Sequence, residues 1–184
     1  MSHAGVALVN PQVIFDKAGI HKGMHVADFG CGRTGHFVFS LSRLVADVGV
    51  VYAVDVLKEV LVEIKSRCRS GGYENVQTIW SDIELPGRTA IPAETVDAIF
   101  FVNVLSLLKQ HSAALGEAGR IIKPGGRVVV VDWSKNLGAV GPRPDALISP
   151  AIVIQKLQDS NFELVEQQSA GDYHYYVIGR KKVL

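Results

Sequence analysis

The sequence predicts an α/β fold, a doubly wound and mostly parallel sheet of seven strands with a C-terminal antiparallel strand pair. Short apolar runs alternate with stretches whose apolar residues recur every three to four positions, as strands and helices do in such folds. The first five runs are apolar almost throughout, which is typical of strands buried on both faces of a parallel sheet. After residue 133 the alternation changes to a loop, one helix and two β-like runs.

Local patterns place the individual elements. Asn10 is a suitable helix cap, Pro11 a suitable first helical residue and Gly19 a suitable end. Ser112 is expected to cap a later helix, and the irregular stretch 84–94 is expected to border the functional site. A hairpin is the simplest arrangement of the last two strands, and other strand orders stay open. The expected elements are helices 11–18, 36–47, 58–69, 112–122 and 150–159, a tight turn at 123–126, and strands 24–29, 50–55, 76–80, 96–104, 127–133, 162–167 and 173–180.

Length, composition and charge limit the class of protein. The 184 residues, 48% hydrophobic and 20% charged, predict one globular domain over residues 1–184. The net charge of +1 does not indicate a surface for nucleic acid. Because Cys31 and Cys68 form no Cys/His cluster, we expect no metal site and a reducing, cytoplasmic location. No apolar run is long enough to span a membrane, and residues 1–10 lack the apolar segment of a signal peptide.

A glycine turn follows the first expected strand. Gly30, Gly32 and Gly35 have the G-x-G-x-x-G spacing of a nucleotide-binding turn, where glycine permits positive φ and free N–H groups of the next helix face the ligand. Asp28 stands two residues before this turn. A carboxylate there would repel a pyrophosphate and suit a cationic cofactor, an ammonium or a sulfonium. The alternative is that Asp28 only accepts hydrogen bonds from the turn.

Polar residues also stand at the carboxyl ends of the other parallel strands, where ligands bind in such sheets. Asp55, at the end of the second strand, can accept hydrogen bonds from two ribose hydroxyls. Asp82, after the third, can accept one from an adenine amino group, although it could simply begin a turn. Asn103 and Asp132 end the fourth and fifth strands. Together these residues predict an acidic rim for a cationic nucleoside.

With these residues the chain resembles a known family, the class I S-adenosylmethionine-dependent methyltransferases. The resemblance implies a Rossmann-like fold. A looser resemblance, carried by residues 141–144 and 173–176, links it to small bacterial and archaeal members near the ubiquinone/menaquinone-biosynthesis methyltransferases. The family pattern is matched in order and spacing by residues 26–35 (V-A-D-F-G-C-G-R-T-G), 51–56 (V-Y-A-V-D-V), 81–83 (S-D-I), 96–104 (V-D-A-I-F-F-V-N-V) and 123–133 (K-P-G-G-R-V-V-V-V-D-W).

The resemblance implies S-adenosyl-L-methionine as the cofactor. Its methionine part would lie on Asp28 and the glycine turn, its ribose on Asp55, and its adenine near Asp82. One departure from the family is Thr34, where a glycine is common, so the turn looks one residue longer. We expect the neighbouring Arg33 to point to solvent or to a carboxylate. The implied cofactor-binding residues are Asp28, Phe29, Gly30, Cys31, Gly32, Gly35, Asp55, Val56, Leu57, Asp82, Ile83, Val102 and Asn103.

The methyl acceptor is less well defined, and no catalytic residue is assigned. The chain lacks N-P-P-Y or D-P-P-Y after the fourth strand, so amino-group methylation of nucleic acids is not indicated. We expect a small-molecule acceptor, and a homodimer is allowed. Three other interpretations stay open: an RNA methyltransferase, a non-catalytic binding or assembly module, and an NAD-dependent oxidoreductase. The candidates for the acceptor pocket are His111, Asp132, Arg143 and His174.

Overall fold

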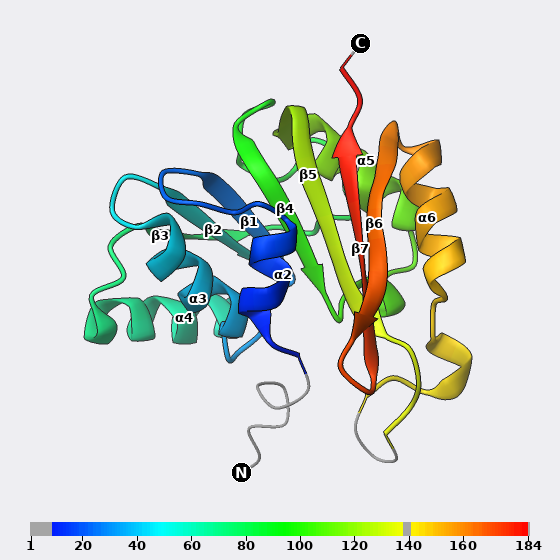
Figure 1. Ribbon diagram of the computed structural model, residues 1–184. Coiled ribbons are helices and arrows are strands. Elements are labelled where there is room, and N and C mark those ends of the chain that lie inside the picture. Colours follow the sequence, from blue (N-terminus) through cyan, green and yellow to red (C-terminus); the bar gives the residue numbers. More distant parts are fainter. Residues whose placement is uncertain (1–8, 138–140, 184) are drawn as a thin grey trace.

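The computed structural model of the chain describes residues 9–137 and 141–183, which form a single seven-stranded sheet covered by helices (Figure 1). Residues 1–8, where the sequence indicates no signal peptide, and residues 138–140 of the loop expected after residue 133 lie outside the described residues. The helices are α2 (Pro11–Lys17), α3 (His36–Val45), α4 (Lys58–Gly71), α5 (His111–Ile121) and α6 (Pro150–Asp159), with short 3-10 turns η1 (Leu105–Leu107) and η2 (Pro144–Ala146). The strands are β1 (His25–Phe29), β2 (Val50–Asp55), β3 (Val76–Trp80), β4 (Val96–Val102), β5 (Ile122–Trp133), β6 (Phe162–Ala170) and β7 (His174–Lys181).

The strand order confirms the doubly wound fold. The order across the sheet is β3-β2-β1-β4-β5-β7-β6. The first five strands in this order run parallel, whereas β7 pairs antiparallel with both β5 and β6. The chain therefore winds outward first in one direction and then in the other, and the reversal lies between β1 and β4. Ligands bind at this switch point in open α/β sheets, beyond the carboxyl ends of the strands.

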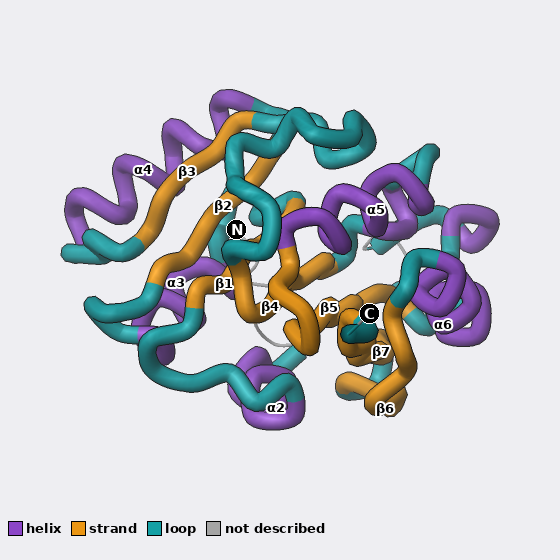
Figure 2. The backbone as a smooth tube through the Cα atoms, turned by 90° about the horizontal axis from the view of Figure 1, so that it is seen from above, coloured by secondary structure: helices purple, strands orange, loops and turns teal. Residues whose placement is uncertain are grey.

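Two hydrophobic layers cover the two faces of the sheet. One layer joins α2, α3 and α4 to the sheet and contains a cluster of aromatic rings around Phe15, Phe37 and Phe100. The other joins α5 and α6 to the opposite face and contains Phe29 and Phe101. Figure 2 shows α2 and α5 on opposite sides of the sheet. The central strands β1, β2 and β4 are mostly apolar because both of their faces are buried.

Several boundaries differ from the sequence prediction. The cap of α5 is Gln110 rather than Ser112, because the helix already begins at His111. The expected turn at 123–126 lies within β5, where the pairing with β4 shifts between Val96 and Ala98 and Gly125 has a φ of +76°. The last two strands do form a hairpin, and β7 is the member that joins it to β5. The predicted cap of α2 is confirmed, since Gln12 N–H donates to Asn10 Oδ1 over 3.0 Å.

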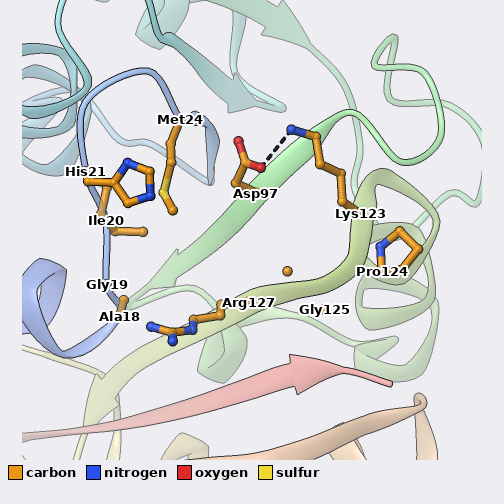
Figure 3. Close-up of a pocket in the computed structure, with 11 residues that line it drawn as sticks. Ala18, Gly19, Ile20, His21, Met24, Asp97, Lys123, Pro124, Gly125 and Arg127 are labelled. Carbon is orange, nitrogen blue, oxygen red and sulfur yellow. Dashed lines mark hydrogen bonds and ion pairs between the residues drawn. The ribbon is translucent and has the colours of Figure 1, made fainter. Parts of the chain in front are cut away.

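The amino edge of the sheet holds a polar cavity of about 370 Å³ (Figure 3). Asp97 ties its walls together, because one carboxylate oxygen accepts from the backbone N–H of His25 and the other from Lys123 Nζ, over 2.8 and 2.7 Å. Arg127 lies beside Ala18 at the end of α2. This cavity is at the opposite end of the strands from the switch point. Among the described residues, no helix combines the length and apolarity needed to cross a membrane.

Candidate functional site

Two adjoining cavities lie at the carboxyl edge of the sheet, at the switch point. The larger has a volume of about 540 Å³ and lies between the end of β2, the segment after β3 and the turn after β4. The smaller, of about 150 Å³, lies between β1, the glycine turn and the start of α3. Both cavities are lined by Gly30, Gly32, Val102 and Asn103, so they form one cleft with two halves.

The glycine turn contributes space to the cleft more than hydrogen-bond donors. Its N–H groups are used within the protein: Gly30 and Cys31 donate to the Val54 carbonyl, and Gly32 donates to Asp55. A side chain at Gly32 would meet no atom within 4 Å, so this residue leaves the cleft open. A Cβ at Gly30 would instead approach Val104 to 2.4 Å. Gly30 is therefore required by packing and by its φ of +77°.

Gly35 lines neither cavity, and a Cβ there would meet Ile64 at 2.5 Å, so this glycine is required by packing. It precedes α3, whose N-terminus has no side-chain cap. Arg33 points to carboxylates as expected, lying 3.9 Å from Glu59 and 3.6 Å from Glu63. Arg33 is therefore directed toward Glu59 and Glu63 of α4, and its positive charge is paired there rather than in the cleft.

Asp28 is the most unusual group of the cleft. Its side chain is only 1% exposed and lines the smaller cavity, and its Oδ1 atom has no hydrogen-bond partner among the described residues. Burial, and secondly the nearby charge of Asp55, raises the pKa of Asp28 to about 7. Burying a carboxylate without a partner is costly, so this arrangement favours a cationic ligand that would restore its ionised form.

Asp55 at the end of β2 is fixed by two backbone hydrogen bonds. Its Oδ2 atom accepts from Gly32 N–H over 3.1 Å, and its Oδ1 atom accepts from Leu57 N–H over 3.0 Å. Each carboxylate oxygen can accept more than one hydrogen bond, so capacity for a ligand remains. The carboxylate lines the larger cavity and joins the glycine turn to the segment that follows β2.

The larger cavity combines this acidic edge with apolar walls. Val56 and Leu57 are 54% and 48% exposed and adjoin each other on the wall of this cavity, where a ligand would cover them. The buried Ile83 and the neighbouring Asp82 also line this half. The Asp82 carboxylate accepts from Glu84 N–H over 2.9 Å, so it has the turn role considered from the sequence while still facing the cavity.

Asn103 stands where the two halves of the cleft meet. It follows β4 with a φ of +56°, a conformation in which asparagine is enriched among residues other than glycine. Its backbone N–H donates to the Val131 carbonyl over 2.8 Å, whereas its side-chain Oδ1 is buried without a partner among the described residues. A strained, unpaired polar group at the junction of two cavities is typical of a ligand-binding position.

Two residues of the smaller half differ from the sequence prediction. Phe29 lines neither cavity, because its ring packs on Phe101 in the opposite layer. His36, the first residue of α3, was not predicted, yet it lines the smaller cavity, and its Nε2 atom is buried without a partner. Its pKa is lowered mainly by burial, so the neutral ring is favoured. Its position directly after the glycine turn is the signal that could have revealed it.

None of the four candidates for the acceptor pocket lines these two cavities. The buried Asp132 accepts from the backbone and the hydroxyl of Ser106 and from Trp133 N–H, which fixes the turn after β4. The His111 ring contacts the Leu105 carbonyl at 2.8 Å. The Arg143 side chain is 83% exposed and pairs with Asp145. His174 is buried beside Trp133.

The segment after β3 borders the larger cavity through Glu84, as expected, and it is held by a buried acid. Glu117 of α5 accepts from the N–H groups of Gly87 and Thr89 over 2.7 and 3.1 Å, and from Arg120. Burial alone would raise the pKa of Glu117, but these hydrogen bonds prevail and lower it to about 2. The segment is therefore anchored by a permanent carboxylate at neutral pH.

The fold, together with an acidic cleft that favours a cationic ligand, defines a class I S-adenosylmethionine-dependent methyltransferase domain. Comparison with known proteins agrees: residues 20–181 match the family described as "Methyltransferase domain". The chain belongs to this methyltransferase family. The predicted class and sheet architecture are thus confirmed.

The curated relatives include ubiquinone/menaquinone biosynthesis C-methyltransferases UbiE. The protein of Pasteurella multocida is 32% identical over 71% of this chain and 48% of its own length. That of Hahella chejuensis is 30% identical over 65% of this chain and 47% of its own length. The chain therefore spans about half the length of the curated relatives it matches.

Solved structures show the same architecture. A SAM-dependent methyltransferase from Aquifex aeolicus superimposes with a TM-score of 0.88 at 27% identity, and the match covers 97% of this chain and 93% of that one. Geranyl diphosphate C-methyltransferase from Streptomyces coelicolor, crystallised with S-adenosyl-L-homocysteine, has a TM-score of 0.74 at 15% identity, with coverage of 94% and 79%. The second likeness concerns the fold alone. Neither the RNA methyltransferase, nor the non-catalytic module, nor the NAD-dependent oxidoreductase is favoured by these comparisons.

Proposed function

We propose that the protein transfers the methyl group of S-adenosylmethionine to a small, largely apolar acceptor. The observation that carries the proposal is the unpaired, buried Asp28 carboxylate beside the open space at Gly32, in the cleft that also contains Asp55. A pyrophosphate would be repelled by these acids, whereas a cofactor with an ammonium and a sulfonium would be attracted.

The larger half of the cleft fits the adenosine part. Asp55 would accept hydrogen bonds from the ribose hydroxyls, because its carboxylate is already oriented by Gly32 and Leu57. Asp82 would accept from the adenine amino group. The side chains of Val56, Leu57 and Ile83 would pack on the adenine ring, and the exposed Val56 and Leu57 would lose their contact with water.

The smaller half fits the methionine part. Asp28 would bind the ammonium group, which provides the partner that its Oδ1 atom lacks. The uncapped N-terminus of α3 would stabilise the carboxylate, with His36 beside it. Cys31 and Val102 would line the walls, and Asn103 would face the junction where the two parts of the cofactor meet.

The bound cofactor supplies a methyl group on a sulfonium, and the chain's own residues align and shield the reaction. In-line transfer depends mainly on alignment of donor and acceptor. Asn103 and Val102 stand at the donor side, and the buried Asp132 holds the turn after β4 in place through Ser106. The curated relatives are C-methyltransferases of quinone biosynthesis, which supports a carbon acceptor in a small molecule. We place the reaction in the cytoplasm.

Isothermal titration calorimetry with S-adenosylmethionine, S-adenosylhomocysteine and NADH tests the cofactor. We expect both sulfur compounds to bind and NADH not to bind. Tight NADH binding without S-adenosylmethionine binding would contradict the proposal. Transfer of a tritiated methyl group to a panel of small phenols, compared with transfer to bulk RNA, then tests the acceptor class. Light scattering on the same samples would show whether the protein is a homodimer.

A further inference from the structure

The cavity at the amino edge of the sheet has no part in the proposed function. Its volume of about 370 Å³ lies within the range of small-molecule sites, about 300–1,000 Å³. Ile20 and Met24 supply apolar surface to its lining. Figure 3 shows His21, Lys123 and Arg127 on different sides of the hollow. The cavity therefore combines apolar surface with side chains that carry or can gain a positive charge.

Arg127 is the cation of this cavity with the fewest partners. It forms no ion pair with a carboxylate among the described residues. Its Nη1 atom donates to the Lys17 carbonyl over a long 3.4 Å, and its other N–H groups have no protein acceptor in the part of the chain that the structure describes. A guanidinium presents its donors as a planar fork that matches the oxygens of a phosphate or carboxylate. Most of this fork is free to bind a ligand.

The acid that lines the cavity, Asp97, does not neutralise Arg127. One Asp97 oxygen accepts from the backbone N–H of His25 over 2.8 Å, and the other accepts from Lys123 Nζ over 2.7 Å. Asp97 therefore compensates Lys123, whose ammonium keeps further N–H groups for a ligand. With His21 neutral, the charges of Lys123 and Arg127 against that of Asp97 leave the lining with a net charge of +1.

The register of the sheet gives a second, independent reason to expect an anion beside Arg127. Arg127 of β5 lies directly opposite Arg180 of β7. Like charges at paired positions destabilise an antiparallel strand pair. Arg180 is compensated by Glu163, its cross-strand neighbour in β6, at 2.6 Å. Because Arg127 has no such acid, an anion in the cavity would relieve the repulsion between the two arginines.

Two glycines leave room around the guanidinium. A Cβ at Gly19 would lie 2.6 Å from Nη1 of Arg127, so the absence of a side chain at the end of α2 makes the space that the guanidinium occupies. A Cβ at Gly125, which lines the cavity, would meet no atom within 4 Å. The backbone on both sides of Arg127 therefore leaves the guanidinium accessible from the cavity.

We propose that this cavity is a second ligand site, which binds a phosphate group through the guanidinium of Arg127 and the ammonium of Lys123. A phosphate suits the site because its oxygens point in several directions and can accept from cations on different sides. The phosphate is either the free ion or the head of a small monoester, whose organic part would lie on Ile20 and Met24. The site is at the opposite end of the strands from the methyl-donor cleft, so it does not depend on the cofactor or on the acceptor.

The test measures the binding of phenyl phosphate, inorganic phosphate and neutral benzyl alcohol by calorimetry at matched ionic strength. We expect both phosphates to bind and benzyl alcohol not to bind. Tighter binding of phenyl phosphate identifies a monoester as the ligand, and otherwise the ligand is the free ion. R127Q should weaken both phosphates at least about tenfold, the scale of hydrogen bonds to a charged group, without lowering the melting temperature. R69Q, which removes an exposed arginine of α4, is the matched control and should bind as wild type.

Other outcomes contradict the inference. A wild type that binds neither phosphate, or that binds benzoate more tightly than phenyl phosphate, would overturn it. So would an R127Q protein with unchanged phosphate affinity, because Arg127 would then only hold the end of α2 through the Lys17 carbonyl. If R127Q does not fold, the Nε–Hε signal of Arg127 in 15N NMR of the wild type decides: it must shift with phenyl phosphate and not with benzyl alcohol. Because no measurement uses S-adenosylmethionine, the proposed function is tested separately.

Discussion

Replacing Asp28 by asparagine should stabilise the ligand-free protein at pH 8 and weaken its binding of S-adenosylmethionine. The ionised carboxylate is buried, and its pKa is raised from 3.8 to about 7. The folded protein therefore binds more protons than the unfolded chain between about pH 4 and 7, and its stability falls as the pH rises through this window. A shift of this size corresponds to at most about 4 kcal/mol, so D28N should gain a few kcal/mol at pH 8.

The affinity for the cofactor should change in the opposite direction to the stability, rising with pH and falling in D28N. The ammonium group binds the ionised form of Asp28, so the affinity of the wild type should decrease about tenfold for each pH unit below 7. D28N should bind S-adenosylmethionine at least about thirtyfold more weakly, because truncating one member of a buried charge pair costs about 2–5 kcal/mol. Its affinity should not vary with pH in this range.

Urea denaturation of the ligand-free protein at pH 5 and pH 8, and calorimetry with S-adenosylmethionine at both values, measure the two effects. D47N changes an exposed aspartate and serves as the matched control. A D28N protein that is less stable at pH 8 and binds the cofactor normally would refute the reasoning, since Asp28 would then be a structural acceptor of the turn.

Three further predictions concern the cleft and its support. G32V should lose about 1–2 kcal/mol of stability because of its positive φ, and it should not bind the cofactor. G72V at the end of α4 has a similar φ and equally open space, so it should lose the same stability and bind the cofactor normally. Thermal melting and calorimetry measure the two effects. D55A should weaken cofactor binding by about 1.5–3 kcal/mol, and an unchanged dissociation constant would remove Asp55 from the site. E117Q should lose up to about 3 kcal/mol at pH 7 in urea denaturation. Because the pKa of Glu117 is lowered to about 2, the wild type should lose this advantage as the pH falls from 4.5 to 2, and a constant difference would contradict its ionic origin.

The order of elements was predictable because the parallel strands are buried on both faces and helix ends carry local signals. The apolar run before Gly30 and the Asn10 cap illustrate this. The position of β7 was not predictable, because an apolar pattern shows that Phe162–Ala170 and His174–Lys181 pair but not which of them also joins β5.

The cleft was predictable where a residue type implies its chemistry, as for Asp55 and Asp82, both of which line the larger cavity. It was less predictable where packing decides the direction of a side chain or the partner of a backbone N–H group. In β5 the side chains alternate, so Asp132 and Trp133 face opposite layers, and Asp132 is engaged by Ser106 of the turn after β4 and lines neither cavity. The N–H groups of Gly30 and Gly32 are likewise set by packing, because they donate to Val54 and Asp55 at the end of β2.

The insertion of β7 between β5 and β6 has a consequence for synthesis on the ribosome. β6 leaves the exit tunnel before the strand that it pairs with, and β5 keeps an open edge until β7 has emerged. An unpaired edge of this kind is an aggregation hazard while translation continues at about 5–20 residues per second. Trp133 and His174 are also brought together only by this last pairing, whereas the strands that carry the cleft, β1, β2 and β4, have already emerged.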